Sequence, residues 1–272
     1  MEADGGKPTL IVSGNCQGSF LARALAECPR VAADYRVVYF RDFRKGDAGV
    51  LSEEDMRSCA FFVEQVAHNR SKLPDLSALP AGCLRVRYPI LWMYSLWPTF
   101  VRDPRSTDPA RPNAGDWPYG DRLILEFLDQ GLTPEEASRR FLETDLRQVM
   151  DLDRFHEINA EKSRQIDEMA DLKWGGPVFD AFQARRLFAT NNHPVPEMLE
   201  TMRQTVFEAI GAPAPPSDLV EASGGMGRIH WPIHPSVAEH FKLEWYDPDA
   251  EHQYFENRYR IGEFMRRYAA FE

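Results

Sequence analysis

The sequence predicts an α/β protein built on a parallel, doubly wound sheet that is flanked by helices and carries a helical insertion. The run Thr9–Val12 is short and rich in β-branched residues, which is typical of a strand buried on both faces. A glycine turn and an amphipathic helix follow it directly, as at the start of such sheets. Candidate strands and helices then alternate over roughly the first ninety residues.

The remaining strands and helices follow from hydrophobic periodicity and from the residues that end each run. The helix after the first turn buries Phe20, Leu21 and Leu25 and ends at Pro29. The predicted strands are Thr9–Val12, Arg36–Phe40, Ala60–Val66, Leu84–Ile90 and Arg186–Thr190. The later predicted helices are Leu51–Ser58, Asp121–Asp129, Pro134–Glu143, Asp151–Leu172, Pro196–Ile210 and His252–Tyr268.

Two helix starts carry recognisable caps. Ser52 is placed to cap the short acidic helix between the second and third strands. Thr133 is a good N-cap, Pro134 a good first helical residue, and Glu136 completes a capping box. We expect a single α/β domain over residues 1–272, with a helical insertion near 103–175 and an extension near 212–272.

Composition limits the partners. Net charge is -10 and the isoelectric point is about 5.3, which argues against nucleic acid or an anionic membrane surface as the main partner. No apolar run approaches the ~20 residues needed to cross a bilayer, and the first residues lack the pattern of a secretory signal. The expected compartment is the cytoplasm. None of the four cysteines has the spacing of a structural zinc site, so no metal is expected.

The turn from Ser13 to Gly18 is the first candidate site. Cys16 follows a buried strand and precedes a helix, so the helix N-terminus should lower the pKa of its thiol. Backbone N–H groups from Cys16 to Ser19 would form an oxyanion hole, and Gly14 and Gly18 let the backbone approach closely. The alternative is a buried cysteine beside a structural glycine turn.

His193 is the best placed of the seven histidines to act as a base for Cys16. It follows the strand Arg186–Thr190 and would therefore lie at the carboxyl edge of the sheet; the alternative is a histidine that caps the next helix. His68 comes just after the third strand, and Gln65, near the end of that strand, is expected to project toward the same edge. His230 and His234 are separated by Pro232, which argues against a helical metal pair.

Nucleotide and phosphatase motifs are missing. The first turn does not match G-x-G-x-x-G, and the chain has no G-K-[ST] sequence. Cys16 and Arg23 are one residue too far apart for the phosphate loop of tyrosine phosphatases. Phosphate groups would instead need arginines near strand ends or in loops, and six are available: Arg85, Arg87, Arg102, Arg105, Arg185 and Arg186.

Several short motifs, in order and over most of residues 8–211, resemble the WcbI-type family of polysaccharide-biosynthesis proteins. The matching pieces are Gly14–Gln17, Gln65, Tyr88–Leu91, Ile124–Phe141 and Leu187–Pro194. The resemblance implies a capsule-associated, coenzyme A-binding acetyltransferase with a Rossmann-like or SGNH-hydrolase-like sheet. In SGNH hydrolases an Asp precedes the catalytic His by three residues, and Thr190 stands at that position. Trp97–Phe100 also departs from the family pattern, at a stretch expected to resemble His-Pro-Asp.

The resemblance therefore implies acetyl transfer from coenzyme A to a sugar hydroxyl, with a dyad of Cys16 and His193 rather than a full triad. Either Cys16 carries the acyl group, or His193 activates the sugar directly and Cys16 only binds. The alternatives are an ester or thioester hydrolase of the SGNH kind and a non-catalytic module that binds coenzyme A or sugar. The residues expected to bind substrate or the oxyanion are Gly14, Asn15, Gln17, Gly18, Gln65, His68 and Asn192.

Overall fold

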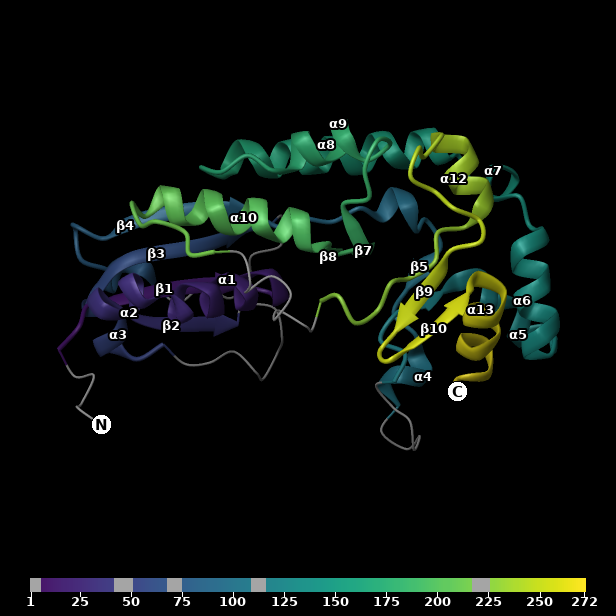
Figure 1. The fold of residues 1–272 in the computed structure, drawn as a ribbon, viewed down its shortest axis with the longest axis horizontal. Coiled ribbons are helices and arrows are strands. Elements are labelled where there is room, and N and C mark those ends of the chain that lie inside the picture. The colour runs from purple at the N-terminus through teal and green to yellow at the C-terminus, as the bar shows by residue number, and fades with distance from the viewer. Residues whose placement is uncertain (1–5, 42–50, 68–74, 109–115, 217–225) are drawn as a thin grey trace. The chain divides into compact units, whose positions relative to one another are not determined.

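The computed structural model describes residues 6–41, 51–67, 75–108, 116–216 and 226–272 (Figure 1). Its chain divides into two compact units. Unit 1 consists of Met1–Leu91, Ala160–Asp180 and Pro194–Met226, and unit 2 consists of Trp92–Asn159, Ala181–His193 and Gly227–Glu272. The single domain and the boundaries of its insertion and extension stay predictions.

Unit 1 is built on a four-stranded parallel sheet, which confirms the α/β fold class. The strand order is β2-β1-β3-β4. The strands are β1 (Thr9–Gly14), β2 (Arg36–Arg41), β3 (Cys59–Val66) and β4 (Leu84–Pro89), all within a few residues of the predicted runs. Every residue of β1 is buried, as expected of a central strand covered on both faces.

Helices cover both faces of this sheet. Helix α1 (Cys16–Glu27) packs on β1 and β2, with α10 (Pro196–Ala209) beside it. On the other face, α3 (Glu53–Arg57) and the 3-10 turn η1 (Leu76–Ala78) close over a cluster of Ile11, Phe40, Met56, Cys59 and Phe62. The predicted cap at Ser52 is present as a capping box with Asp55. Further elements in or entering this unit are α2 (Pro29–Asp34), α8 (Leu152–Met169) and α9 (Gly175–Ala181).

Unit 2 combines helices with short two-stranded sheets around an aromatic core. Trp117 lies at its centre: it stacks on Tyr254 at 3.9 Å and meets Phe264 edge-on. Helix α6 (Pro134–Glu143) begins with the predicted capping box of Thr133 and Glu136. The other elements are η2 (Tyr94–Leu96), β5 (Phe100–Val101), α4 (Pro104–Thr107), β6 (Gly120–Asp121), α5 (Arg122–Asp129), α7 (Leu146–Val149), α12 (Pro235–Phe241) and α13 (Ile261–Ala270).

The prediction of one long helix over His252–Tyr268 is wrong in its first half. The chain there forms an antiparallel hairpin of β9 (Glu251–Tyr254) and β10 (Asn257–Arg260), and only then enters α13. The two-residue turn places Phe255 at φ 52, a left-handed conformation that glycine or asparagine usually adopts. Because no such residue marks this turn, the sequence carried no local hairpin signal.

The late strand also differs from its prediction. β7 (Phe188–Thr190) pairs with β8 (His193–Pro194) and is not a strand of the four-stranded sheet. The apolar residues of β7 are buried, as they would be in a strand of the main sheet. The backbone neighbour of β7 is instead Trp231, whose N–H donates to the carbonyl of Ala189 at 2.9 Å. Strand character could be read from the sequence, whereas the sheet that the strand joins could not.

Candidate functional site

The turn between β1 and α1 is packed around the hydroxyl group of one buried tyrosine. Tyr88, at the carboxyl end of β4, donates its hydroxyl to the carbonyl of Ser13 at 3.0 Å. A Cβ atom added to Gly14 would lie 2.5 Å from that oxygen, and one added to Gly18 would lie 2.7 Å from it. Glycine is therefore needed at both positions to admit the Tyr88 hydroxyl, which is a steric requirement of the tertiary structure.

Two buried glutamines hold the turn to its neighbours. Gln65, on β3, accepts the backbone N–H of Asn15 at 2.9 Å and donates its amide to Gln17 at 3.1 Å. Gln17 in turn bonds both backbone groups of Leu91, with its amide nitrogen 2.8 Å from the carbonyl and its amide oxygen 3.1 Å from the N–H. The structure thus joins β1, α1, β3 and the end of β4 through side-chain amides.

Asn15 caps α1. Its side-chain oxygen accepts the N–H of Gln17 at 2.9 Å, and its carbonyl accepts the N–H of Ser19 at 2.9 Å. On the β2 side, the hydroxyl of Tyr39 lies 2.9 Å from the carbonyl of Gly14 and 2.8 Å from that of Asn15. Asn15, Gln17 and Gln65 were expected to bind substrate; their contacts here fix the shape of the turn.

Cys16 is the first residue of α1 and a free thiol, and between Ser13 and Gly18 only its side chain is partly exposed. The expected lowering of its pKa is wrong. Burial raises the pKa of the Cys16 thiol above its ordinary value, against the smaller opposing effects of the backbone N–H groups of Gln17 and Cys16 and the charge of Arg41. At neutral pH Cys16 is therefore protonated, and a nucleophilic role requires a base.

His193 belongs to unit 2, whereas Cys16 belongs to unit 1. The Nδ1 atom of His193 lies 2.9 Å from the hydroxyl of Tyr119. Thr190, at the position of the missing Asp, is fully buried and donates its hydroxyl to the side-chain oxygen of Asn192 at 3.4 Å. Because β7 is not part of the main sheet, the expectation that His193 follows a strand of that sheet is wrong. His68 lies outside the described residues.

The candidate phosphate-binding arginines fall into different environments. Arg85, Arg87 and Arg105 each form an ion pair with a carboxylate, at 2.7, 2.7 and 2.8 Å. Their partners are Glu64, Asp171 and Asp103. Arg102 and Arg185 are exposed, and Arg186 is half-buried. An arginine that already pairs with a carboxylate is a weaker anion ligand, since the new anion must displace the old one.

Sequence reasoning assigned no role to Tyr88 or Tyr39. The sequence signal for Tyr88 was the pair Gly14 and Gly18. Two positions without a side chain, four residues apart, leave space for one large side chain from elsewhere in the chain. Which side chain enters the gap depends on the order of the strands, and that order is a long-range property. Tyr39 reaches the turn because β2 pairs with β1 in register up to Gly14 and Arg41.

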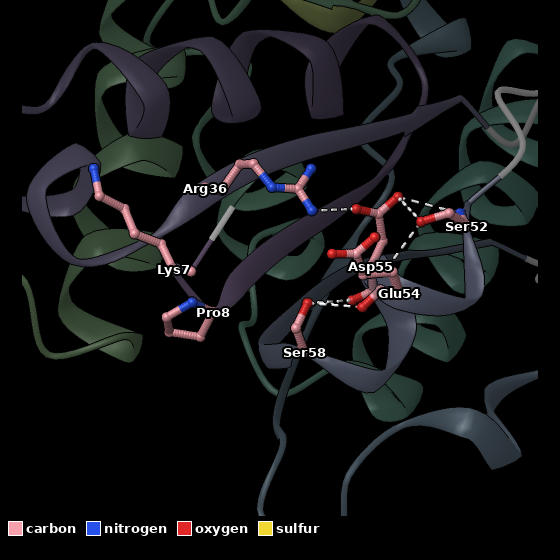
Figure 2. Close-up of a pocket in the computed structure, with 8 residues that line it drawn as sticks. Lys7, Pro8, Arg36, Ser52, Glu54, Asp55 and Ser58 are labelled. Atoms are coloured by element: carbon pink, nitrogen blue, oxygen red, sulfur yellow. Dashed lines mark hydrogen bonds and ion pairs between the residues drawn. The ribbon is translucent and has the colours of Figure 1, made fainter. Parts of the chain in front are cut away.

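A surface hollow of about 630 Å³ lies in unit 1 at the amino ends of the strands, the edge opposite Cys16 (Figure 2). Two of its charged side chains pair with each other: Arg36 forms an ion pair with Asp55, which also accepts the hydroxyl of Ser52. Ligands of parallel sheets bind beyond the carboxyl ends of the strands, so the Cys16 turn is the better candidate site.

Comparisons with known proteins point to one family. A solved structure described as WcbI, a novel polysaccharide biosynthesis enzyme, is 18% identical with a TM-score of 0.64, over 98% of this chain and 91% of that chain. Its description specifies the native protein without a disulfide bond between coenzyme A and one of its cysteines. At this identity the likeness shows the fold. No curated protein matches the chain.

No helix among the described residues is long and apolar enough to cross a membrane. The family model for the polysaccharide biosynthesis enzyme WcbI matches residues 9–215, which include the whole four-stranded sheet and the Cys16 turn. The chain therefore belongs to the WcbI family of polysaccharide biosynthesis enzymes.

Proposed function

We propose that this protein transfers an acetyl group from coenzyme A to a sugar hydroxyl during polysaccharide synthesis. The observation that carries the proposal is the thiol of Cys16, which is partly exposed at a helix N-terminus while its neighbours from Ser13 to Gly18 are buried. The solved WcbI structure is described with reference to a disulfide between coenzyme A and a cysteine. Such a disulfide brings the coenzyme A sulfur against a protein thiol, and the thioester of an acyl donor uses the same sulfur atom.

The first turn of α1 supplies donors for the oxyanion. Asn15 accepts the N–H groups of Gln17 and Ser19, so the proposed donors are the backbone N–H groups of Cys16 and Gly18. An oxyanion held there develops as the acyl carbon becomes tetrahedral, which lowers the barrier to transfer. The buried amides of Gln17 and Gln65 have a positioning role, because they fix the backbone that carries those donors.

His193 is the proposed general base. In direct transfer it takes the proton of the sugar hydroxyl, the hydroxyl oxygen forms the ester bond, and the coenzyme A sulfur leaves and receives a proton. In a covalent route it takes the proton of Cys16 first, because the raised pKa keeps that thiol protonated. The Cys16 thiolate then attacks the acetyl carbon, and coenzyme A leaves as its thiol with that proton. In the second half the sugar hydroxyl attacks the acetyl-Cys16 thioester, its proton passes to the base, and Cys16 is released and reprotonated. The hydroxyl of Tyr119 beside Nδ1 orients the imidazole ring.

The test begins with coenzyme A binding. A thermal shift with coenzyme A at ~100 times its dissociation constant should add ~2.7 kcal/mol to the unfolding free energy. Cys16→Ala should abolish acetyl transfer to a panel of sugar acceptors in the covalent route and reduce it in the direct route, and Cys83→Ser should do neither. Cys83 is the matched control, since it is also a free, partly exposed thiol of unit 1.

Mass spectrometry of the protein mixed with acetyl-coenzyme A separates the two routes, because only the covalent one acetylates Cys16. Acetyl-coenzyme A consumption without any acceptor would indicate hydrolysis instead. No thermal shift with coenzyme A, or full transfer activity in Cys16→Ala and His193→Ala, would refute the proposal.

A further inference from the structure

Among the candidate arginines, Arg186 is half-buried without an ion pair to a carboxylate of the described residues, whereas Arg102 and Arg185 are exposed. Arg186 lies between α9 and β7. Its Nε atom donates to the carbonyl of Phe188 at 3.3 Å, and its guanidinium lies 5.8 Å from the centre of the Trp245 ring. Burial lowers the pKa of Arg186, and no carboxylate opposes this. A cation held in this way is costly unless an anion joins it.

Backbone pairing in unit 2 gathers further basic groups beside Arg186. The N–H of His230 donates to the carbonyl of Gln253 on β9 at 2.8 Å, and the next residue, Trp231, donates to Ala189 on β7. Arg258 on β10 is paired in register with the same Gln253. His230, Gln253 and Arg258 therefore lie side by side across three adjacent segments, and Arg186 lies two residues before the start of β7.

The charges of these groups act on one another. Burial, and then the charges of Arg186 and Arg258, lower the pKa of His230 to about 4. Burial, Arg186 and His230 together lower the pKa of His252 to about 4, and its Nδ1 atom is buried without a hydrogen-bond partner among the described residues. No carboxylate is among the causes of either shift.

Two acidic residues in or next to the hairpin pair elsewhere, and a third, Glu251 at the start of β9, is in register with Arg260 rather than with Arg258. Asp249 forms an ion pair with Arg260 at 3.5 Å, and Glu256 forms one with Arg228 at 3.2 Å. In a chain with net charge -10, the described residues supply no ion-pair partner to Arg186 or Arg258. Together with His230, these two arginines offer guanidinium and imidazole donors to an anion.

We propose that Arg186, His230 and Arg258, here called the Arg186 cluster, bind a phosphate group of the mono- or diphosphate type. His252 is not part of the cluster, because it neighbours Gln253 on β9 and its side chain therefore leaves the opposite face of the strand. Guanidinium groups bind phosphate oxygens with paired N–H donors, and imidazole adds a single donor. Two chemistries carry such groups, the phosphates of coenzyme A and the diphosphate of a nucleotide-linked sugar. The cluster is inferred from its own contacts and does not depend on acyl transfer at Cys16.

The primary test is calorimetric titration of the full-length protein with inorganic pyrophosphate. Wild type should bind, and Arg186→Gln should weaken binding at least tenfold, with Arg258→Gln weakening it less because that side chain is exposed. Arg260→Gln is the matched control, since it lies on the same strand but already pairs with Asp249. Absence of binding to wild type, or binding by Arg186→Gln within twofold of wild type, would overturn the proposal.

A second readout does not depend on affinity. Bound pyrophosphate neutralises the charges that depress the pKa of His230, so an NMR titration of its imidazole should show a higher pKa with pyrophosphate than without. Arg258→Gln should also raise the pKa of His230 in the free protein, which keeps the proposal testable if Arg186→Gln does not fold. An unchanged His230 pKa on adding saturating pyrophosphate would contradict the assignment.

Competition then identifies the source of the phosphate. Displacement of pyrophosphate by coenzyme A assigns the cluster to the acyl donor, and displacement by a nucleoside diphosphate alone assigns it to the sugar substrate. Cys16→Ala should bind pyrophosphate as wild type does. Failure of the acyl-transfer proposal would thus leave the cluster intact, and failure of pyrophosphate binding would leave the Cys16 experiments unaffected.

Discussion

The turn of Ser13–Gly18 in unit 1 and the Arg186 cluster in unit 2 use polar groups in different ways. Around the turn, the side chains of Asn15, Gln17 and Gln65 form hydrogen bonds with backbone groups or with one another. The thiol of Cys16 is the partly exposed group between them. In the cluster, Arg186, Arg258 and His230 lie together, and no carboxylate of the described residues forms an ion pair with either arginine.

This contrast separates two kinds of site. Internal hydrogen bonds make the turn rigid, so its backbone donors and thiol are held in place before a ligand arrives. The cluster keeps charge in a half-buried place, so a bound anion would relieve an unfavourable interaction. Substitutions in the turn should therefore reduce stability, whereas substitutions in the cluster should reduce ligand binding with little loss of stability.

The largest expected effect is that of Gly14→Ala. Its Cβ would lie 2.5 Å from the Tyr88 hydroxyl and 3.1 Å from the Gln65 side chain, both buried. We expect the unfolding free energy to fall by about 3 kcal/mol, measured by urea denaturation. Gly82→Ala is the control, because nothing lies within 4 Å of its added Cβ. Equal stability of the two variants would show that the turn is not tightly packed.

Gln17→Ala should have the next largest effect. It removes the partner of the buried N–H and carbonyl of Leu91 and one bond of Gln65. The expected loss is about 2 to 3 kcal/mol in the same denaturation experiment, since buried backbone groups without partners are costly. Glu at this position restores the side-chain length but turns an oxygen toward the Leu91 carbonyl. Recovery of full stability by Gln17→Glu would argue against the described amide orientation.

Arg186→Gln should behave differently. Without an anion, its unfolding free energy should stay within about 1 kcal/mol of wild type, because the lost contact with Trp245 is offset by removal of a half-buried unpaired charge. With pyrophosphate at ~100 times the dissociation constant, wild type should gain ~2.7 kcal/mol and the variant should gain none. A loss of several kcal/mol in the free variant would make Arg186 a structural residue.

The smallest expected effect concerns the titration of Cys16. The rate of alkylation by iodoacetamide, followed by mass spectrometry of the Cys16 peptide, should rise with a midpoint above the ordinary thiol pKa of 9.0. Because the charge of Arg41 lowers the pKa of Cys16, Arg41→Gln should move the midpoint higher by a few tenths of a unit. A midpoint below pH 8 would mean that the helix N-terminus outweighs burial.

Local features were predictable because their causes lie within a few residues of each other. The apolar run of β1, the glycine turn and the capping box at Thr133 each depend on neighbours along the chain, and each is present in the structure. The hairpin of β9 and β10 was missed because its turn uses Phe255 at positive φ, where no local residue signals it. Tyr254 of that hairpin stacks on Trp117, and this stabilising contact joins residues that are far apart in the sequence.

The sequence by itself determined that a parallel sheet opens the chain, that Cys16 stands at the junction of its first strand and helix, and that the chain resembles the WcbI family. Only the tertiary structure decided that burial raises the pKa of Cys16, that Gln17 and Gln65 hold the turn, and that β7 lies outside the main sheet. The same holds for Arg186, to which the described part of the chain supplies no carboxylate partner of the kind that Arg85, Arg87 and Arg105 have. The reason is physical: strand and helix signals act over a few residues, whereas burial, pairing and charge depend on groups that folding brings together from distant parts of the chain.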